Sequence, residues 1–216
     1  MNTKTISIES INKDFSSFGG IKIYDLIYNS LKIRNHTQEL LPAKKLKSGI
    51  SQTDKLKTLI FKFICGGDCL DDLDWLRHDT AFKTITKGAI APTTAGEFLR
   101  SFSKRSIELL EEQMTLLALK QRQILFPKDK DFELAIDSTP HIQTGLQMEG
   151  LEFDYKNNWG LNSQNAYDQH GFSYGFQLRP GATYSANGAG AMIRNILSNV
   201  YNSILEINKN TIKWKK

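Results

Sequence analysis

The stretch Glu133-Leu-Ala-Ile-Asp-Ser-Thr-Pro-His141 joins a strand-like apolar run to a short series of polar side chains. The apolar run ends at Asp137, which two hydroxyl groups, a proline and an imidazole follow. Ligands and metals in α/β sheets lie outside the carboxyl ends of strands, and a carboxylate there can bind a hard divalent cation. We therefore expect Asp137 to be a metal ligand. The alternative is that Asp137 caps a turn by bonding the backbone two residues on.

Length and composition are those of an ordinary globular chain. The 216 residues are 40% hydrophobic and 24% charged, which is enough for one or two domains with a sizeable core. The formal net charge of +5 is uneven, since residues 1–130 carry 21 Lys+Arg against 15 Asp+Glu and residues 131–216 carry 7 against 8. The basic excess in the first part favours a polyanionic partner.

Cys65 and Cys69 are the two cysteines of the chain, too few for a disulfide framework. No second Cys/His pair lies near them, so we expect buried free thiols in a reducing compartment rather than a zinc site. No stretch reaches the roughly 18–20 apolar residues that a membrane span needs, and the N-terminus lacks the apolar core of a signal peptide. These features predict a cytoplasmic protein without a membrane partner.

The first 130 residues predict mostly helices after a short strand around residues 6–11. One helix is expected from Ser51 to the glycines that follow residue 65. The clearest helix runs from Ile107 to Leu125, where apolar residues recur at helical spacing as in a packing helix. The residues of the first helix expected to face a core are Leu56, Leu59, Ile60 and Phe63.

Two polar groups in this region have a structural and a functional interpretation. Asp71, Asp72 and Asp74 complement the dipole at a helix start, and the alternative is a metal site. Arg100 and Lys104 lie on the outer face of a short helix that begins at Pro92. Such a helix after a preceding one is compatible with a helix-turn-helix in a DNA major groove, or with a plain core helix that has a charged outer face.

The second part predicts three strands followed by a helix. After the strand at Asp137, two strands meet at the turn Gln169-His-Gly171, and a helix opens at about Asn187 and ends near Leu205. This order fits the first part of an RNase H-like sheet. We expect an α+β or α/β fold, with a mostly helical DNA-binding region at 1–130 and a partial RNase H-like domain at 131–216. In such folds two or three carboxylates hold divalent ions against a phosphodiester.

Several short motifs, taken in order, resemble one family. They resemble the DDE-type transposases of bacterial insertion sequences, over roughly residues 55–205. Upstream, Gly66-Gly67-Asp68 and the segment 73–79 take part in the likeness. The motifs of the second part are Ala135-Ile-Asp-Ser-Thr139, Tyr155-Lys156 with Trp159-Gly160, Gly171-Phe-Ser-Tyr-Gly175, and Gln177-Leu-Arg-Pro-Gly181.

The resemblance implies DNA transposition. In a complete transposase of this type, an Asp-Asp-Glu triad holds two Mg²⁺ ions, and the enzyme cleaves the terminal inverted repeats and joins them to target DNA. Asp137 matches the first acid. No Asp follows Asp168, and Glu206 is the only later acid, so the other two acids have no match. One carboxylate cannot hold two ions in the required geometry. We expect the N-terminal part of a transposase, inactive alone.

Other side chains keep two interpretations each. His141 is a candidate contact to DNA or to the surroundings of the metal, or a loop histidine bonded to backbone. Arg179 is a candidate phosphate contact or a strand-end surface charge. Tyr155 and Trp159 are expected to pack rather than to stack on bases.

Two other functions remain open from the sequence. One is a non-enzymatic DNA-binding module that occupies insertion-sequence ends, or that pairs with a full-length transposase or with itself as an inhibitor. The other is a different metal-dependent nuclease that uses Asp137 with Asp154 or Asp168.

Overall fold

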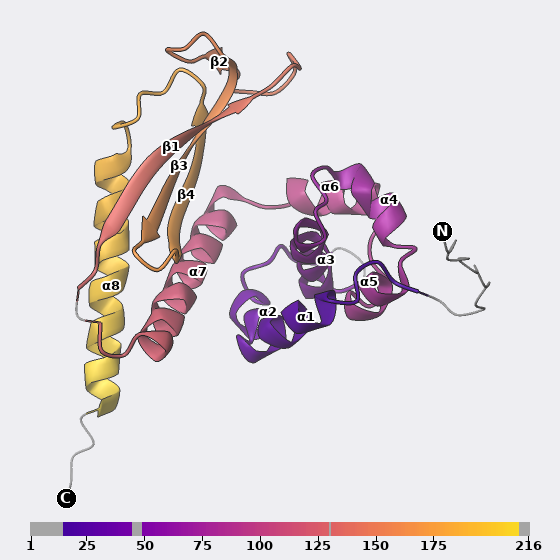
Figure 1. The fold of residues 1–216 in the computed structure, drawn as a ribbon, viewed down its shortest axis with the longest axis horizontal. Helices are drawn as coiled ribbons and strands as arrows, with labels where there is room; N and C mark the ends of the chain where they lie inside the picture. Colours follow the sequence, from indigo (N-terminus) through magenta and orange to yellow (C-terminus); the bar gives the residue numbers. More distant parts are fainter. Residues whose placement is uncertain (1–14, 45–48, 130, 212–216) are drawn as a thin grey trace, which may run out of the picture. The chain divides into compact units, whose positions relative to one another are not determined.

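The structure, a computed structural model, describes residues 15–44, 49–129 and 131–211 (Figure 1). The strand expected around residues 6–11 lies outside these residues. Contacts divide the chain into two compact units, Met1–Ser106 and Ile107–Lys216. The first is helical and the second combines an antiparallel sheet with long helices, so the fold is of the α+β class. No helix in the described ranges is long and apolar enough to cross a bilayer.

The first unit consists of short helices. Ser51 caps the longest of them by accepting a hydrogen bond from the backbone N–H of Asp54, and Gly66, at a φ of +82°, follows its end. Both ends of this helix agree with the sequence prediction. The elements are α1 (Ile21–Ser30), α2 (Ile33–Thr37), α3 (Gln52–Ile64), the 3₁₀ turn η1 (Leu70–Asp72), α4 (Leu73–Leu76), α5 (Thr80–Ile85) and α6 (Pro92–Arg100).

The buried face of α3 differs from the predicted one. Phe63, expected in the core, is 63% exposed, whereas Phe61 is fully buried. The buried face of α3 includes Lys57, one helical turn before Phe61. The Nζ of Lys57 lies 2.6 Å from Asp25 Oδ1 and over the rings of Tyr28 and Phe61. A lysine with a carboxylate partner and aromatic neighbours can enter a core, and the apolar pattern alone does not reveal these partners.

The second unit is built around a central strand. β3 pairs antiparallel with the whole length of β1 and with most of β4. It also pairs with the short β2 at Trp159 and Gly160. The turn predicted at residues 169–171 joins β3 to β4. The elements are α7 (Lys104–Leu125), β1 (Leu134–Ile142), β2 (Glu152–Phe153), β3 (Trp159–Asp168), β4 (Ser173–Pro180) and α8 (Ala189–Thr211).

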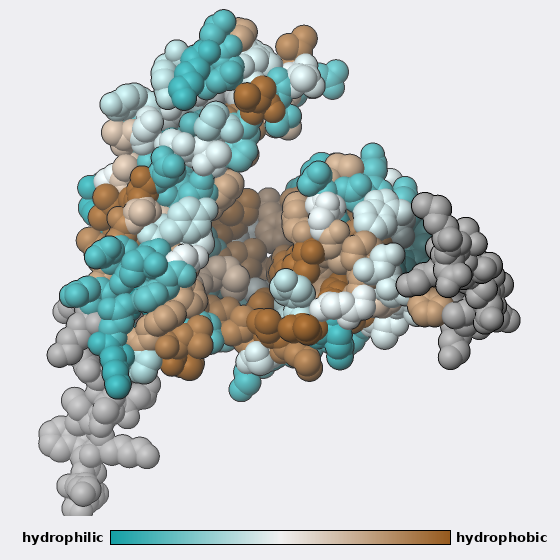
Figure 2. Space-filling view, in the orientation of Figure 1, coloured by the Kyte–Doolittle hydropathy of each residue, from teal (hydrophilic) through white to brown (hydrophobic). Residues whose placement is uncertain are grey.

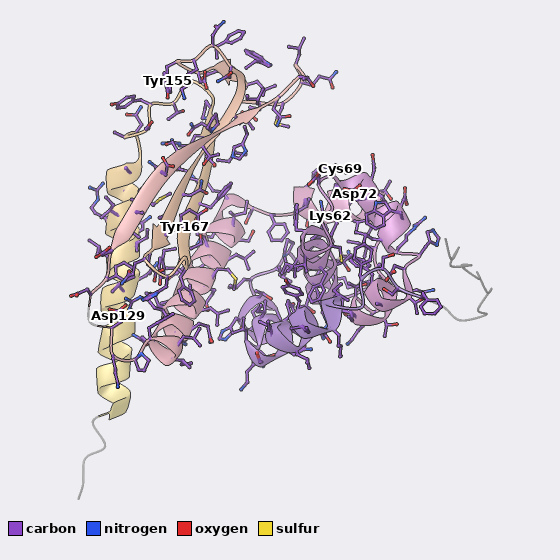
Figure 3. The ribbon with its side chains drawn as sticks, in the orientation of Figure 1. Lys62, Cys69, Asp72, Asp129, Tyr155 and Tyr167 are labelled. Atoms are coloured by element: carbon purple, nitrogen blue, oxygen red, sulfur yellow. The ribbon has the colours of Figure 1, made fainter. Side chains whose placement is uncertain are left out.

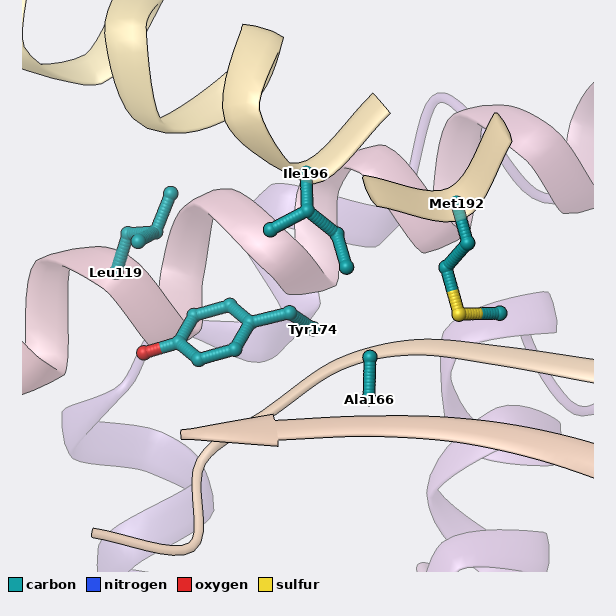
Figure 4. Packing of buried hydrophobic residues seen from close by; sticks show 5 residues of the cluster. All are labelled: Leu119, Ala166, Tyr174, Met192 and Ile196. Atoms are coloured by element: carbon teal, nitrogen blue, oxygen red, sulfur yellow. The ribbon is translucent and has the colours of Figure 1, made fainter. Parts of the chain in front are cut away.

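The core of this unit lies between the sheet and its two long helices. Leu119 of α7 packs with Tyr174 of β4 and with Met192 and Ile196 of α8 (Figure 4). Partly buried Leu134, Ile136 and Phe132 surround them. The prediction that α7 is a packing helix is confirmed, and α7 belongs with the sheet, because the division between the units falls at Ser106.

Candidate functional site

Asp137 lies in the middle of β1 and not at its end. The strand continues from Asp137 for five residues to Ile142, and Asp137 pairs with Asn165 of β3. The expected strand end was therefore misplaced. Pro140 does not stop the strand, because β1 is an edge strand and a proline nitrogen that faces away from the sheet interrupts no ladder bond.

The side chain of Asp137 is exposed on the sheet face opposite the core. Side chains alternate along a strand, so Leu134 and Ile136 point to the core while Asp137, Thr139 and His141 share the other face. The carboxylate Oδ1 accepts a hydrogen bond of 2.7 Å from the backbone N–H of Ser138. This bond goes to the next residue and not to the residue after it, so Asp137 is no turn cap.

The open face around Asp137 is chemically mixed. Phe176 and Leu178 of β4 alternate on it at 55% and 54% exposure, and Tyr167 of β3 is 41% exposed. Figure 2 shows apolar and hydrophilic residues interspersed over the visible surface of this unit. The side chains beside Asp137 on this face of β1 and β3 are Ala135, Thr139 and Asn165, so no second carboxylate lies directly beside it among the described residues.

Asp168 cannot share an ion with Asp137. It lies opposite Leu134, three positions along β3 from the partner of Asp137, and so points to the other face. Its Oδ2 accepts bonds from Arg122 Nε (3.0 Å) and Tyr174 Oη (2.8 Å). Burial, and after it the hydrogen bond to Asp168, raises the pKa of the Tyr174 hydroxyl. Asp168 is therefore a buried structural acid.

Asp154 organises a turn at the far end of the sheet. Its Oδ1 accepts the backbone N–H groups of Lys156 and Asn158, both at 2.8 Å. The side-chain amide of Asn158, followed by these backbone bonds, holds the pKa of Asp154 below its usual value. About six residues of strand, or about 20 Å, separate this turn from Asp137. Within the described residues no group of three or more His, Cys, Asp or Glu could hold a metal, so these residues do not fit a two-ion site.

Arg179 is buried rather than presented to solvent. It is 5% exposed, and its Nη2 donates to Ser138 Oγ (2.9 Å) and Asn162 Oδ1 (2.5 Å), while Nη1 donates to the backbone O of Asn187 (2.5 Å). Burial lowers the pKa of the guanidinium. In this arrangement Arg179 joins β4, β3 and β1 to the loop before α8, and it is not available to a phosphate.

His141 is a strand residue with a side-chain partner. Its Nε2 lies 2.8 Å from Ser163 Oγ on the neighbouring strand. The expectation of a loop histidine bonded to backbone is wrong, because β1 extends past Pro140. His141 shares the face of Asp137 at a separation of four residues along the strand, which is about 13 Å.

The candidate DNA contacts of the first unit are on its surface. Arg100 ends α6 and Lys104 begins α7, and both are exposed. Phe98 of the same helix is buried, as the plain core-helix interpretation requires. Of the upstream acids, Asp72 caps the turn η1 by accepting the backbone N–H groups of residues 68 and 69, which explains it without a metal.

Two features of the second unit differ from or go beyond what the sequence predicts. Tyr155, expected to pack, is 89% exposed at a turn where Asn157 has a φ of +64°, whereas Trp159 packs on Phe153 as expected. Asp154 and Asn157 are turn-forming residue types, and they were the signal available for this exposed tip.

The other missed feature is a polar cluster at the opposite end of the second unit (Figure 3). Asp129 Oδ2 lies 2.6 Å from His170 Nε2 and 3.1 Å from Arg122 Nη2. The bond from His170 holds the pKa of Asp129 below its usual value. The His170 ring also stacks on Phe126 at 3.6 Å between centroids. The cluster fastens the segment after α7 to the β3–β4 turn, and no sequence motif signalled it.

Comparisons with known proteins found no matching family model, no matching curated protein and no matching solved structure.

Proposed function

We propose that the second unit contributes the first strands and helix of an RNase H-like domain of a DDE-type DNA transposase, with Asp137 as the first acid of the triad. The observation that supports this most is the placement of Asp137. It is exposed at the centre of the first strand of an antiparallel meander β1–β3–β4, and α8 follows that meander and packs on the opposite face.

In the complete transposase Asp137 would supply one ligand to Mg²⁺, and phosphodiester cleavage and strand transfer belong to that complete protein. Among the described residues no second acid lies directly beside Asp137 on β1 or β3, and no group of three or more His, Cys, Asp or Glu could hold a metal. We therefore expect this chain alone to cleave no DNA.

The DNA partner in this proposal is the terminal inverted repeat of an insertion sequence. Residues 1–106 carry 17 Lys+Arg against 11 Asp+Glu, a net charge of +6, whereas residues 107–216 carry 11 against 12, a net charge of −1. Phosphate contacts by lysine and arginine release counterions and make binding depend on salt. The first unit is thus the better candidate for duplex binding, with Arg100 and Lys104 as contacts.

Fluorescence anisotropy with a labelled duplex at 50 to 200 mM salt tests this proposal. We expect salt-dependent binding, and the double variant Arg100→Ala with Lys104→Ala should lower the slope against log salt by about 2. The control, Lys120→Ala with Lys128→Ala, removes the same charge from exposed positions of the second unit. Absence of duplex binding at 50 mM salt, or an equal loss in both variants, would contradict the proposal.

A second candidate is a non-enzymatic partner of a full-length transposase. The observation that favours it is the edge of β1, to which no backbone outside β1 is hydrogen-bonded on the side away from β3 in the described residues. Affinity co-purification with a complete transposase distinguishes the two candidates, since a partner is retained without DNA whereas a simple DNA-binding chain is lost after nuclease treatment.

A further inference from the structure

The two edges of the sheet differ in what covers them. At the β4 edge, Thr115 Oγ1 of α7 donates to the backbone O of Tyr174 (2.9 Å), and the backbone N–H of Phe176 points to Glu111 Oε1 (3.4 Å). The opposite edge is β1, which is nine residues long. Its outward N–H and C=O groups form no hydrogen bond with the backbone of another described segment. An uncovered edge of this length is a template for pairing with another strand.

The outward-facing groups of β1 follow from the strand alternation. Gln143 N–H donates to Trp159 O, so residue 143 faces β3. Backbone groups alternate in direction along an antiparallel strand, and the even-numbered residues therefore face outward. Among them Pro140 has no N–H, and the N–H of Ser138 is held by the carboxylate of Asp137. The stretch able to pair is Leu134–Ser138.

We propose that this edge pairs with β1 of a second copy of the chain, antiparallel and with its two-fold axis at Ile136, and that Asp137 controls the pairing. In this register Leu134 lies opposite Ser138 of the other copy, and Ala135 lies opposite Asp137. The contact is independent of the transposase proposal, because it needs only the backbone and register of β1.

A second copy fits this edge because the stretch is self-complementary. With the axis at Ile136, each Asp137 meets an alanine, whereas an axis at residue 137 would place two carboxylates opposite each other, which is destabilising. With the axis at Ser138, Ile136 would lie opposite Pro140 of the other copy. Pro140 has no N–H, so one backbone donor would be missing on each copy. The chosen register makes about six backbone hydrogen bonds, and it joins Ile136 to its copy along the core face.

Asp137 opposes this pairing by occupying a donor that the pairing uses. The N–H of Ser138 must leave the Asp137 carboxylate to reach the carbonyl of Leu134 in the other copy. Removal of the carboxylate should therefore tighten the dimer, although no new contact is added. Asp137→Ala frees the donor completely, while Asp137→Asn keeps a weaker acceptor and should fall between Asp137→Ala and the natural chain.

Sedimentation equilibrium of the full chain from micromolar to millimolar concentration measures this effect. We expect a concentration-dependent monomer–dimer equilibrium, with a dissociation constant about 25-fold lower for Asp137→Ala, because each of the two copies frees one Ser138 N–H and one hydrogen bond is worth about fivefold. A chain that stays monomeric in both forms overturns the proposal, as does an Asp137→Ala variant that dimerises no more tightly than the natural chain.

Cysteine cross-linking tests the register itself. In a background of Cys65→Ser and Cys69→Ser, chains with Ala135→Cys are mixed with chains with Asp137→Cys. These positions form a non-hydrogen-bonded antiparallel pair about 4.5 Å apart between Cα atoms, within the range for a disulfide. We expect an oxidised heterodimer. The control pairs Ala135→Cys with Thr139→Cys, on the same face but out of register, and equal cross-linking there would refute the register.

Discussion

At the scale of single residues, the polar side chains of the second unit divide into structural and free groups. Arg179 and Asp168 are buried and bonded to several neighbours, so their loss should show in stability. Asp137 and Tyr155 are exposed, and their loss should leave the fold unchanged. Sequence position near a motif did not separate these two groups, because burial depends on which face of the sheet each side chain takes.

Replacement of Arg179 by lysine should destabilise the second unit by about 2 kcal/mol. Lysine keeps the charge, but one ammonium cannot reach Ser138, Asn162 and Asn187 together. Urea unfolding followed by circular dichroism measures the change. Arg194→Lys, at an exposed position of α8, is the matched control and should alter stability by less than about 0.5 kcal/mol. Equal effects would mean that the bonds of Arg179 contribute nothing.

Removal of one hydroxyl group distinguishes the two kinds of tyrosine. Tyr174→Phe should cost about 1–2 kcal/mol, because it removes a buried donor to the Asp168 carboxylate. Tyr155→Phe should cost nothing measurable, since that ring is 89% exposed. Thermal unfolding of both variants under one set of conditions gives the comparison. A destabilised Tyr155→Phe protein would show that the turn packs on something in solution.

At the scale of elements, the connection from α7 to β1 depends on pH through Asp129. Its pKa in the folded chain lies below the usual value, so its contribution to stability is present above the unfolded pKa of about 4 and is lost as pH falls through the folded pKa. Asp129→Asn should therefore flatten the loss of stability as pH falls below about 4. Urea midpoints measured at pH 7, 4 and 3 check this, and parallel curves for both proteins would contradict it.

Elements were easier to predict than the site. The helix α7, the turn at residues 169–171 and the strand–hairpin–helix order follow from apolar periodicity and turn residues, and the structure has them. The end of β1 was misplaced because the apolar run stops at Asp137, whereas pairing with β3 carries the strand on to Ile142. The burial of Lys57 and Arg179 depends on partners distant in sequence, which local patterns do not contain.

At the scale of the whole molecule, the position of α7 defines which segment can fold. The core of the second unit uses Leu119, and Thr115 and Arg122 bond to the sheet. A chain of residues 104–216 should therefore unfold cooperatively in urea. A chain of residues 131–216 lacks α7 and should show no cooperative transition. Similar transitions in the two chains would show that α7 is dispensable.

The contacts of α7 with the β4 edge also limit how many copies of this sheet can associate. A sheet with two open borders can add chains without end and grow into a fibre. Because α7 occupies backbone groups of Tyr174 and Phe176 at the β4 edge, β1 is the longer run of unbonded outer strand backbone in the described residues. Association through β1 would thus stop at a pair, and solutions of this protein should stay clear of fibrils for as long as α7 remains docked.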